Sequence, residues 1–261
     1  MTFGFMGMMT KLLREYKPSH LALVLDVSGD QGTFRSQLYP EYKAQRDPPP
    51  EDLRPQVDRC LDLLQQMRVP IYGEEGVEAD DVIATIVGRV RQSNPEMLIR
   101  IISKDKDLQQ LLDEATALID VHKDELTDPA ALEAKSGIAP GQVIDMLTLM
   151  GDNADNIPGV PGIGPKTAAQ LVAEYGTIEG VFAQIENEAE QPKTKWAIKG
   201  KRRENLIASR ELMALGRTLI TLKHDCEVEF TLDDMVLDPT QMDTPALLDS
   251  LRSGVNAEIR A

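Results

Sequence analysis

Four short acidic groups lie within the first 155 residues, and their side chains are the ones best suited to chemistry. Each group follows an apolar run typical of a strand or a helix, or begins a helical pattern. The eight acids are Asp26, Glu78, Asp80, Asp81, Asp105, Asp107, Asp152 and Asp155. If they converge, their like charges need a counter-charge. Hard divalent cations, Mg²⁺ or Mn²⁺, supply it, and a set without histidine or cysteine argues against zinc.

Two such ions, held about 3.5–4 Å apart, clamp the attacking and leaving oxygens of an in-line displacement at phosphorus. Phosphodiester hydrolysis is therefore the natural chemistry of a converged set. It needs no covalent nucleophile, because a water activated by the metal is sufficient.

Each group also has an ordinary explanation when it is taken alone. The stretch VEADD (77–81) is typical of a helix N-terminus, where acids cap the helix and complement its dipole. The stretch KDKD (104–107) fits an exposed turn, and GDNADN (151–156) fits a loop. Both interpretations stay open for any single group, and the metal hypothesis depends on the groups meeting in space.

Strand and helix patterns alternate around these acids. Apolar runs predict strands at His20–Val27, Val69–Gly73, Met97–Ser103 and Ala117–Val121, with CEVEF (226–230) as a late candidate. Helical spacing predicts helices over Met1–Lys17, Leu53–Met67, Glu78–Gln92, Lys106–Leu112 and Gln142–Met150. The alternation predicts an α/β fold with a mostly parallel sheet flanked by helices, whose ligands gather at the carboxyl ends of the strands. After Pro140 helical patterns dominate.

Composition limits the possible classes. The 261 residues carry 28 Lys+Arg against 43 Asp+Glu, a net charge of −15, which excludes a uniformly basic nucleic-acid coat but not a local basic patch. No apolar run approaches the roughly 18 residues needed to span a bilayer, and the N-terminal stretch is not typical of a signal peptide. Cys60 and Cys226 form neither a disulfide framework nor a metal pattern. We expect a cytoplasmic protein.

A second signal is the Gly/Pro-rich stretch GVPGIGPKTA (159–168), which predicts a tight hairpin followed by a helix. Glycines let a backbone approach a phosphate, and a helix N-terminus directs N–H groups at it. This is the helix-hairpin-helix pattern, which grips a DNA backbone without reading bases. The basic run KTKWAIKGKRR (193–203) follows it; a solvated face is the ordinary explanation, and a phosphate-tracking patch with salt-dependent binding is the functional one.

These motifs together resemble the structure-specific 5′ nuclease family, in particular the 5′–3′ exonuclease domain of bacterial DNA polymerase I. The matching blocks are VLDVSGDQGTFRSQLYPEYKAQR, VEADDVI, ISKDKDLQQLL, LMGDNADNIPGVPGIGPKTAAQL and KGKRRENL. The resemblance implies a PIN-like fold with a helical arch over residues 33–52 and a helix-hairpin-helix over residues 157–175. It divides the chain into an α/β nuclease core (1–139) and a helical DNA-binding region (140–261).

The resemblance also implies roles for individual residues. Asp26, Glu78, Asp80 and Asp81 would serve a first metal site, Asp105 and Asp107 would link two sites, and Asp152 and Asp155 would complete the second. Arg35, Lys43 and Arg46 fall in the arch segment that steers the scissile phosphate in relatives. The DNA-binding set is Gly159, Val160, Gly162, Ile163, Gly164, Lys166, Thr167, Lys199, Lys201, Arg202 and Arg203. Relatives hold a K⁺ ion near the hairpin as well as two Mg²⁺ or Mn²⁺.

One departure from the family pattern stands out. Members begin with an apolar strand of the form LLLVDG, whose aspartate is a metal ligand, and this chain lacks that strand before Phe3. The leading hypothesis is a monomeric, metal-dependent 5′–3′ exonuclease and flap endonuclease acting in primer removal and DNA repair. Its substrates would be 5′ flaps, nicked or primer-template junctions and RNA primers. The alternative is a branched-DNA-binding protein that is catalytically impaired because it lacks the first aspartate.

Overall fold

The structure is a computed structural model that describes residues 2–187 and 198–238. Its chain divides into two compact units, each built from separate stretches of sequence. One unit comprises Met1–Val27, Arg46–Glu74 and Glu227–Ala261, and the other comprises Ser28–Gln45 and Glu75–Cys226. These units differ from a division along the sequence, so the domain boundary near residue 139 stays a prediction.

The first unit is a small helix pair on a short sheet. Helix α1 (Thr2–Glu15) packs against α3 (Leu53–Gln66), and β1 (Leu23–Val24) pairs in parallel with β2 (Ile71–Tyr72). The buried apolar cluster of this unit contains Met9, Leu64, Met67 and Val69. Both helices lie where the apolar spacing predicts them, but the two strands are much shorter than the apolar runs that contain them.

The second unit holds a three-stranded sheet. Strand β3 (Ile99–Ile102) pairs in parallel with β4 (Thr116–Asp120), and β4 pairs in antiparallel fashion with β5 (Glu125–Thr127). Strand β4 is buried along almost its whole length, as the continuous apolar run predicts. The mixed α/β class and the parallel pairing are confirmed. Among the described residues, however, the strands form two sheets, whereas the sequence predicted one.

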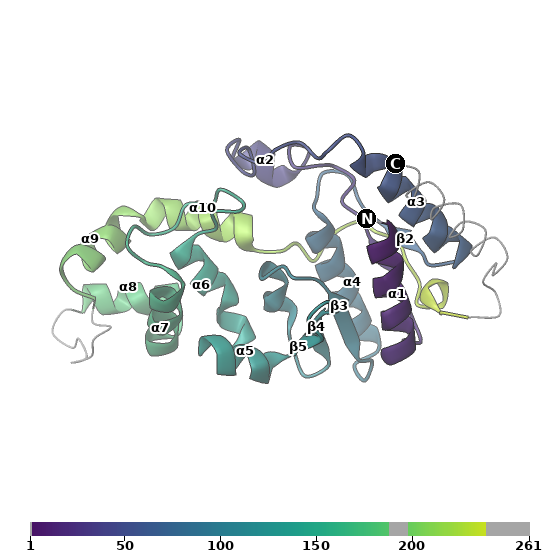
Figure 1. The fold of residues 1–261 in the computed structure, drawn as a ribbon. Coiled ribbons are helices and arrows are strands. Elements are labelled where there is room, and N and C mark those ends of the chain that lie inside the picture. The colour runs from purple at the N-terminus through teal and green to yellow at the C-terminus, as the bar shows by residue number, and fades with distance from the viewer. Residues whose placement is uncertain (1, 188–197, 239–261) are drawn as a thin grey trace. The chain divides into compact units, whose positions relative to one another are not determined.

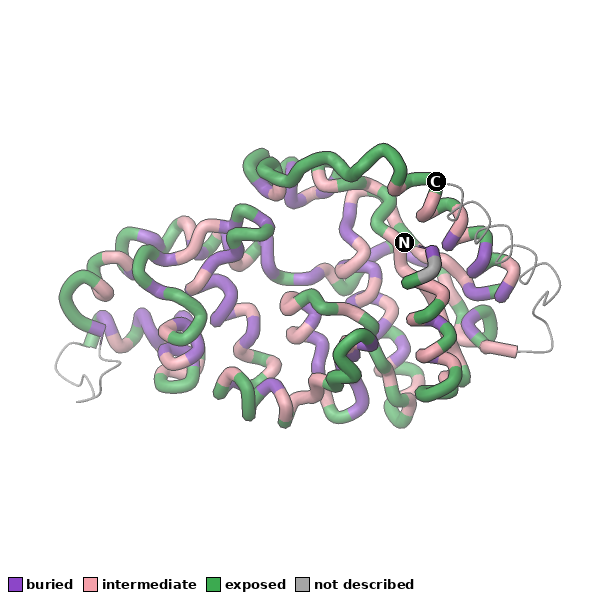
Figure 2. Tube along the Cα trace, in the orientation of Figure 1, coloured by how far each residue is buried: buried purple, intermediate pink, exposed green. Residues whose placement is uncertain are grey.

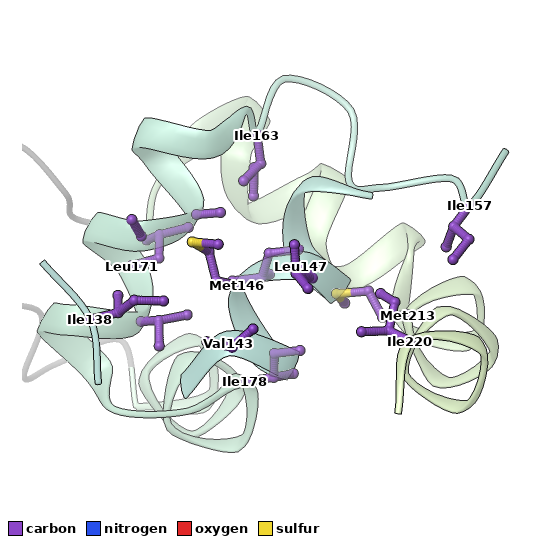
Figure 3. Close-up of a cluster of buried hydrophobic side chains, with 14 of the residues drawn as sticks. Ile138, Val143, Met146, Leu147, Ile157, Ile163, Leu171, Ile178, Met213 and Ile220 are labelled. Carbon is purple, nitrogen blue, oxygen red and sulfur yellow. The ribbon is translucent and has the colours of Figure 1, made fainter. Parts of the chain in front are cut away.

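Helices make up most of the second unit. Their bounds are α2 (Phe34–Leu38), α4 (Ala79–Ser93), α5 (Pro129–Ser136), α6 (Val143–Met150), α7 (Pro165–Tyr175), α8 (Ile178–Glu186), α9 (Gly200–Ala208) and α10 (Arg210–Ile220). Helix α6 packs against both α7 and α10 (Figure 1). Buried residues run along nearly all of α6 (Figure 2). Figure 3 shows Met146 and Leu147 of α6 between Leu171 of α7 and Met213 of α10. These four side chains belong to the main apolar core.

Several local predictions differ from the structure. The stretch CEVEF (226–230) has no strand pairing, so that prediction is wrong. The predicted helix Lys106–Leu112 is a short 3-10 turn, η1 (Asp107–Leu111). Helix α5 was not predicted, although Asp128 caps it and Gly137 ends it in the left-handed conformation. No helix in the described ranges combines the length and the apolar character that a membrane crossing requires.

Candidate metal centre

The N-terminus of α4 carries the VEADD acids, which have different surroundings. Asp81 is fully buried, and its Oδ2 accepts a hydrogen bond from the backbone N–H of Glu78 at 3.1 Å. Asp81 therefore caps its own helix, as the ordinary interpretation of VEADD predicts. The carboxylate of Glu78 lies 3.1 Å from Arg35 Nη1 and also contacts Lys43. Asp80, in contrast, is under the influence of the negative charges of Asp105 and Glu78.

Arg35 of α2 is the main partner of Asp81. Its guanidinium binds both oxygens of Asp81, with Nη1–Oδ2 at 2.5 Å and Nη2–Oδ1 at 2.8 Å, and Nε donates to Leu219 O at 2.6 Å. Only 1% of Arg35 is exposed. Burial alone would lower the pKa of Arg35, but the hydrogen bonds and charge of Asp81 outweigh it and raise the pKa.

This geometry concerns two predicted site residues, Arg35 as a residue that steers a phosphate and Asp81 as a metal ligand. The oxygens of Asp81 are engaged by Arg35, by its own helix and by the backbone N–H of Lys223 at 2.8 Å. The pair is a buried ion pair that connects α2, α4 and the end of α10, and the phosphate-steering role of Arg35 and the metal-binding role of Asp81 stay predictions.

The KDKD turn presents its acids at the start of η1. Asp105 is exposed, and its Oδ1 accepts the backbone N–H of Asp107 at 2.9 Å, which fixes the turn. Lys106 extends its Nζ to within 3.0 Å of Asp152 Oδ2. Asp107 is half-buried, and the charges of Asp152 and Asp155 act on it. The turn therefore brings two acids and one lysine to the same group.

The GDNADN loop is held by backbone pairing. Asp152 and Ile157 exchange two N–H···O bonds, each 2.7 Å long, and Asp152 Oδ1 accepts the N–H of Ala154 at 2.8 Å. Gly151 ends α6 with a φ of +71° and lies against Gly159. A Cβ on Gly159 would come within 2.3 Å of the Met150 backbone. Two glycines packed back to back thus allow the loop to turn tightly enough to place Asp152 and Asp155.

We expect Gly159→Ala to destabilise the protein by about 1–3 kcal/mol, because its Cβ meets backbone that cannot move aside. The change should lower the urea midpoint of unfolding and weaken binding of Mn²⁺ at the loop. The matched control is Gly141→Ala, because a Cβ there meets nothing within 4 Å. Equal midpoints for the two variants would contradict the close approach of Gly159 to the end of α6.

Three carboxylates form the tightest group in the described part of the chain. Asp107, Asp152 and Asp155 each offer one oxygen, and these oxygens all lie within 4.8 Å of one another. Burial together with the charges of Asp105, Asp152 and Asp155 raises the pKa of Asp107 to about 8. Burial together with the charges of Asp105 and Glu78 likewise raises the pKa of Asp80 to about 7. The charge of Asp105 thus acts on both acids, while its role between two metal sites stays a prediction.

The residues present fit divalent cations. Their donors are carboxylate oxygens alone, which Mg²⁺ and Mn²⁺ prefer. Two ammonium groups already serve as stand-in cations: Lys106 on Asp152, and Lys43 on Glu78 with Asp155 Oδ2 at 3.8 Å. The ordinary interpretation, isolated acids in separate loops, does not describe this group.

Tyr42 lies between the two acidic motifs. Its hydroxyl is 3.0 Å from Glu78 Oε2 and 3.2 Å from Asp155 Oδ2, and only 2% of the residue is exposed. Burial and the charges of Glu78 and Asp155 raise the pKa of Tyr42 above its ordinary range. Sequence reasoning assigned Tyr42 no role. The available signal was the pair of tyrosines, Tyr39 and Tyr42, in the segment that precedes three prolines.

The segment around Tyr42 is bound to the GDNADN loop at several points. Lys43 N donates to Asp155 O at 3.0 Å, Gln45 Nε2 donates to Ala154 O at 3.0 Å, and Asn156 Nδ2 donates to Glu41 O at 2.7 Å. These bonds join positions more than 100 residues apart in sequence. The part of the predicted arch segment around Tyr42 therefore stabilises the GDNADN loop.

Two predicted site residues lie in the other unit. Asp26 follows β1 and is exposed, and Arg46 lies in an exposed stretch that runs from Ala44 to Asp52. The structure does not place that unit relative to the acidic group, so the roles of Asp26 and Arg46 stay predictions. Lys193, Lys195 and Trp196 of the basic run lie outside the described residues.

The hairpin predicted to hold DNA lies between α6 and α7. Val160 and Ile163 are buried, so only their backbone groups can face a ligand, while Gly162, Gly164 and Lys166 are exposed. Asn205 of α9 donates to Pro161 O at 2.7 Å and so ties the basic helix to the hairpin. The remaining predicted residues are Gly159 and Thr167 at intermediate exposure, Lys199 and Lys201 exposed, and Arg202 and Arg203 half-buried.

The raised pKa values give a pH prediction. In the folded, metal-free protein Asp107 and Asp80 bind protons up to about pH 8 and about pH 7, whereas unfolded aspartate releases them near pH 3.9. The folded state thus binds more protons than the unfolded state between about pH 4 and about pH 8, so the free energy of unfolding falls as the pH rises through this range. Burial alone would raise the pKa of Asp81, but the hydrogen bond and charge of Arg35 lower it below its ordinary value. Asp81 therefore changes the stability only at pH values below about 3.9, the ordinary pKa of aspartate.

We therefore expect Mn²⁺ to raise the melting temperature more at pH 8 than at pH 6, because protons compete with the metal at the lower pH. Thermal denaturation with about 5 mM MnCl₂, on the order of a saturating concentration for such sites, and with EDTA measures both shifts. A larger shift at pH 6 would contradict this sign.

The fold agrees with solved nuclease structures. Bacteriophage T5 5′-exonuclease with bound zinc superposes with a TM-score of 0.66 at 23% identity, covering 96% of this chain and 90% of that one. The T5 D15 flap endonuclease in a complex with DNA and metal ions gives a TM-score of 0.65 at 22% identity, covering 98% and 90%. These similarities define the class as a 5′-nuclease fold.

Sequence comparison gives the family. A family model described as the 5′-3′ exonuclease N-terminal resolvase-like domain matches residues 1–137, and one described as the 5′-3′ exonuclease C-terminal SAM fold matches residues 138–243. The chain belongs to the 5′-3′ exonuclease family, as the resemblance predicted. It is 38% identical over 239 residues to DNA polymerase I of Bacillus caldotenax, and 37% over 243 residues to that of Rhizobium leguminosarum. These alignments cover 89% and 90% of this chain but 26% and 23% of the relatives, so the chain spans about a quarter of their length.

Proposed function

We propose that this chain is a divalent-metal-dependent 5′–3′ exonuclease and 5′-flap endonuclease. The observation that carries the proposal is the convergence of Asp107, Asp152 and Asp155, whose oxygens lie within 4.8 Å of one another. Membership of the 5′-3′ exonuclease family supports it. The T5 flap endonuclease structure in a complex with DNA supports DNA as the partner.

The proposed cofactors are two Mg²⁺ or Mn²⁺ ions. Asp107, Asp152 and Asp155 would hold one, while Glu78 and Asp80 would contribute to the other, with Asp105 between them. When bound, such ions activate water and stabilise the charge that develops on the scissile phosphate. The role of this chain is to fix those oxygens: Gly151 and Gly159 shape one loop, and Tyr42 spans the acids of two elements.

The proposed DNA-binding surface is the hairpin between α6 and α7 together with α9. Exposed glycines leave the hairpin backbone open to a phosphate, and Lys166, Lys199 and Lys201 add positive charge in a protein whose net charge is −15. We also propose that carbonyls of the hairpin hold a K⁺ ion. The protein would act as a monomer in primer removal and DNA repair.

The test is cleavage of a 5′-flap DNA by the folded protein. We expect product with Mg²⁺, none with EDTA, and weaker binding as salt rises, because phosphate contacts release counterions. A folded protein that leaves flaps intact in both Mg²⁺ and Mn²⁺ would falsify the nuclease proposal. If it still retains flaps in a gel-shift assay, the non-catalytic DNA-binding alternative replaces it.

A further inference from the structure

Lys106 has no role in the proposed nuclease chemistry. It lies between Asp105 and Asp107 in sequence, and its Nζ is 3.0 Å from Asp152 Oδ2. Asp152 is one of the three acids whose oxygens converge. Its other oxygen, Oδ1, already accepts the backbone N–H of Ala154 at 2.8 Å. The ammonium therefore lies on Oδ2, the oxygen of Asp152 that the N–H of Ala154 does not occupy.

A divalent ion and an ammonium compete for that oxygen. A Mg²⁺ ion binds carboxylate oxygen at about 2.0–2.1 Å and carries twice the charge of Lys106. Two cations at one oxygen repel each other, so binding of the divalent ion favours departure of the ammonium. The lysine side chain is 36% exposed against 9% for Asp152, so Lys106 can swing to water on its flexible stem while Asp152 stays fixed.

We propose that Lys106 is a tethered counter-cation, which neutralises Asp152 in the metal-free protein and is displaced from it by the divalent ion. The inference rests on the proposed metal site and adds its regulation. Lys106 stabilises the metal-free fold by shielding repelling carboxylates, and it weakens the affinity of the site for the ion. Removing it should therefore change these two quantities in opposite directions.

The same turn supplies a matched control. Lys104 lies two residues earlier, and its Nζ is 3.9 Å from Asp120 Oδ1 with the side chain 62% exposed. Asp120 is outside the converging group. Lys104→Gln and Lys106→Gln remove the same charge from the same turn, so the difference between them isolates direct contact with the site.

The experiment is titration of the full chain with MnCl₂ by calorimetry, with thermal denaturation in EDTA and in saturating MnCl₂. We expect Lys106→Gln to bind Mn²⁺ about two- to fivefold more tightly than Lys104→Gln, the range of a partly exposed ion pair. Its melting temperature should fall in EDTA and match that of the wild type in MnCl₂. Lys106→Arg, which keeps the charge, should stay near the wild-type affinity.

Other outcomes overturn the inference. Equal or weaker Mn²⁺ binding by Lys106→Gln, or melting temperatures lowered equally with and without Mn²⁺, would mean that Lys106 has a purely structural role. If the wild-type protein binds no Mn²⁺, the proposed function fails with it. If the wild type binds Mn²⁺ but the two glutamine variants are alike, only the inference about Lys106 fails.

A measurement on the unaltered protein covers the case in which Lys106→Gln does not fold. Brief acetylation followed by peptide mass spectrometry reports how accessible each lysine amine is. We expect Mn²⁺ to increase modification of Lys106 and to leave Lys104 unchanged. Unchanged or slower modification of Lys106 under saturating Mn²⁺ contradicts displacement.

Discussion

Asp107→Asn should abolish Mg²⁺-dependent cleavage of a 5′-flap DNA and at the same time make the metal-free protein more stable. The variant keeps the shape of the side chain and removes its charge. Loss of a ligand that serves metal catalysis is worth several kcal/mol, so we expect a fall in rate of roughly 10³-fold or more. The backbone N–H of Asp107 donates to Asp105 and its backbone carbonyl accepts from Gln110, and both hydrogen bonds survive the change.

The gain in stability follows from repulsion. Burial and three neighbouring carboxylates raise the pKa of Asp107 to about 8, so its ionised form is unfavourable in the folded protein. Asparagine removes that cost, and the melting temperature in EDTA at pH 8 should rise by a few degrees, since 1 kcal/mol corresponds to about 2–4 °C at this size. Asp58→Asn in α3, which neutralises an exposed acid, is the control and should change neither property.

Opposite effects on activity and stability separate a site acid from a structural one. Neutralising a structural acid lowers both the activity and the stability. Flap cleavage by Asp107→Asn within about tenfold of wild type, or a melting temperature that falls in EDTA, would show that Asp107 does not belong to a strained metal centre.

Arg35→Met should cause a severe loss of stability. It leaves Asp81 buried at 0% exposure without its guanidinium, and leaves Leu219 O without its 2.6 Å donor. Breaking a buried ion pair by removing one partner costs about 3–5 kcal/mol. Urea denaturation in EDTA measures the loss without involving the metal.

A double variant tests the cause. Arg35→Met with Asp81→Leu removes both charges, and replacing both partners by apolar groups is often tolerated. We expect the double variant to be less destabilised than the sum of the single changes. Arg91→Met, which removes a partly exposed arginine from Asp113 and from the exposed Glu114, should cost only about 1 kcal/mol. Strict additivity of the Arg35 and Asp81 changes would mean that their contact contributes little.

Much of the site could be predicted because its signals are local. Acids at the starts of helices and after apolar runs follow from period and composition, and the Gly/Pro hairpin follows from turn chemistry. Asp107, Asp152 and Asp155 were predicted as ligands and do converge.

What could not be predicted depends on contacts between distant positions. Sequence alone gives Arg35 a charge but not its partner Asp81, 46 positions away, so the buried ion pair was not predicted. Tyr42 was missed for the same reason, since its hydroxyl meets an acid 113 positions away. The apolar run at His20–Val27 predicted a long strand, whereas the strand covers only Leu23–Val24 and His20 forms a separate bridge with Val236. Hydrophobicity reports a tendency to be buried, but strand length depends on the pairing that neighbours provide.

The most direct test is anomalous diffraction from a crystal of the protein soaked in MnCl₂. We expect a Mn²⁺ peak within about 2–2.5 Å of oxygens from Asp107, Asp152 and Asp155, with the Lys106 ammonium moved away from Asp152. Well-ordered side chains with no Mn²⁺ among these three residues, or Mn²⁺ bound only elsewhere on the protein, would contradict the central claim.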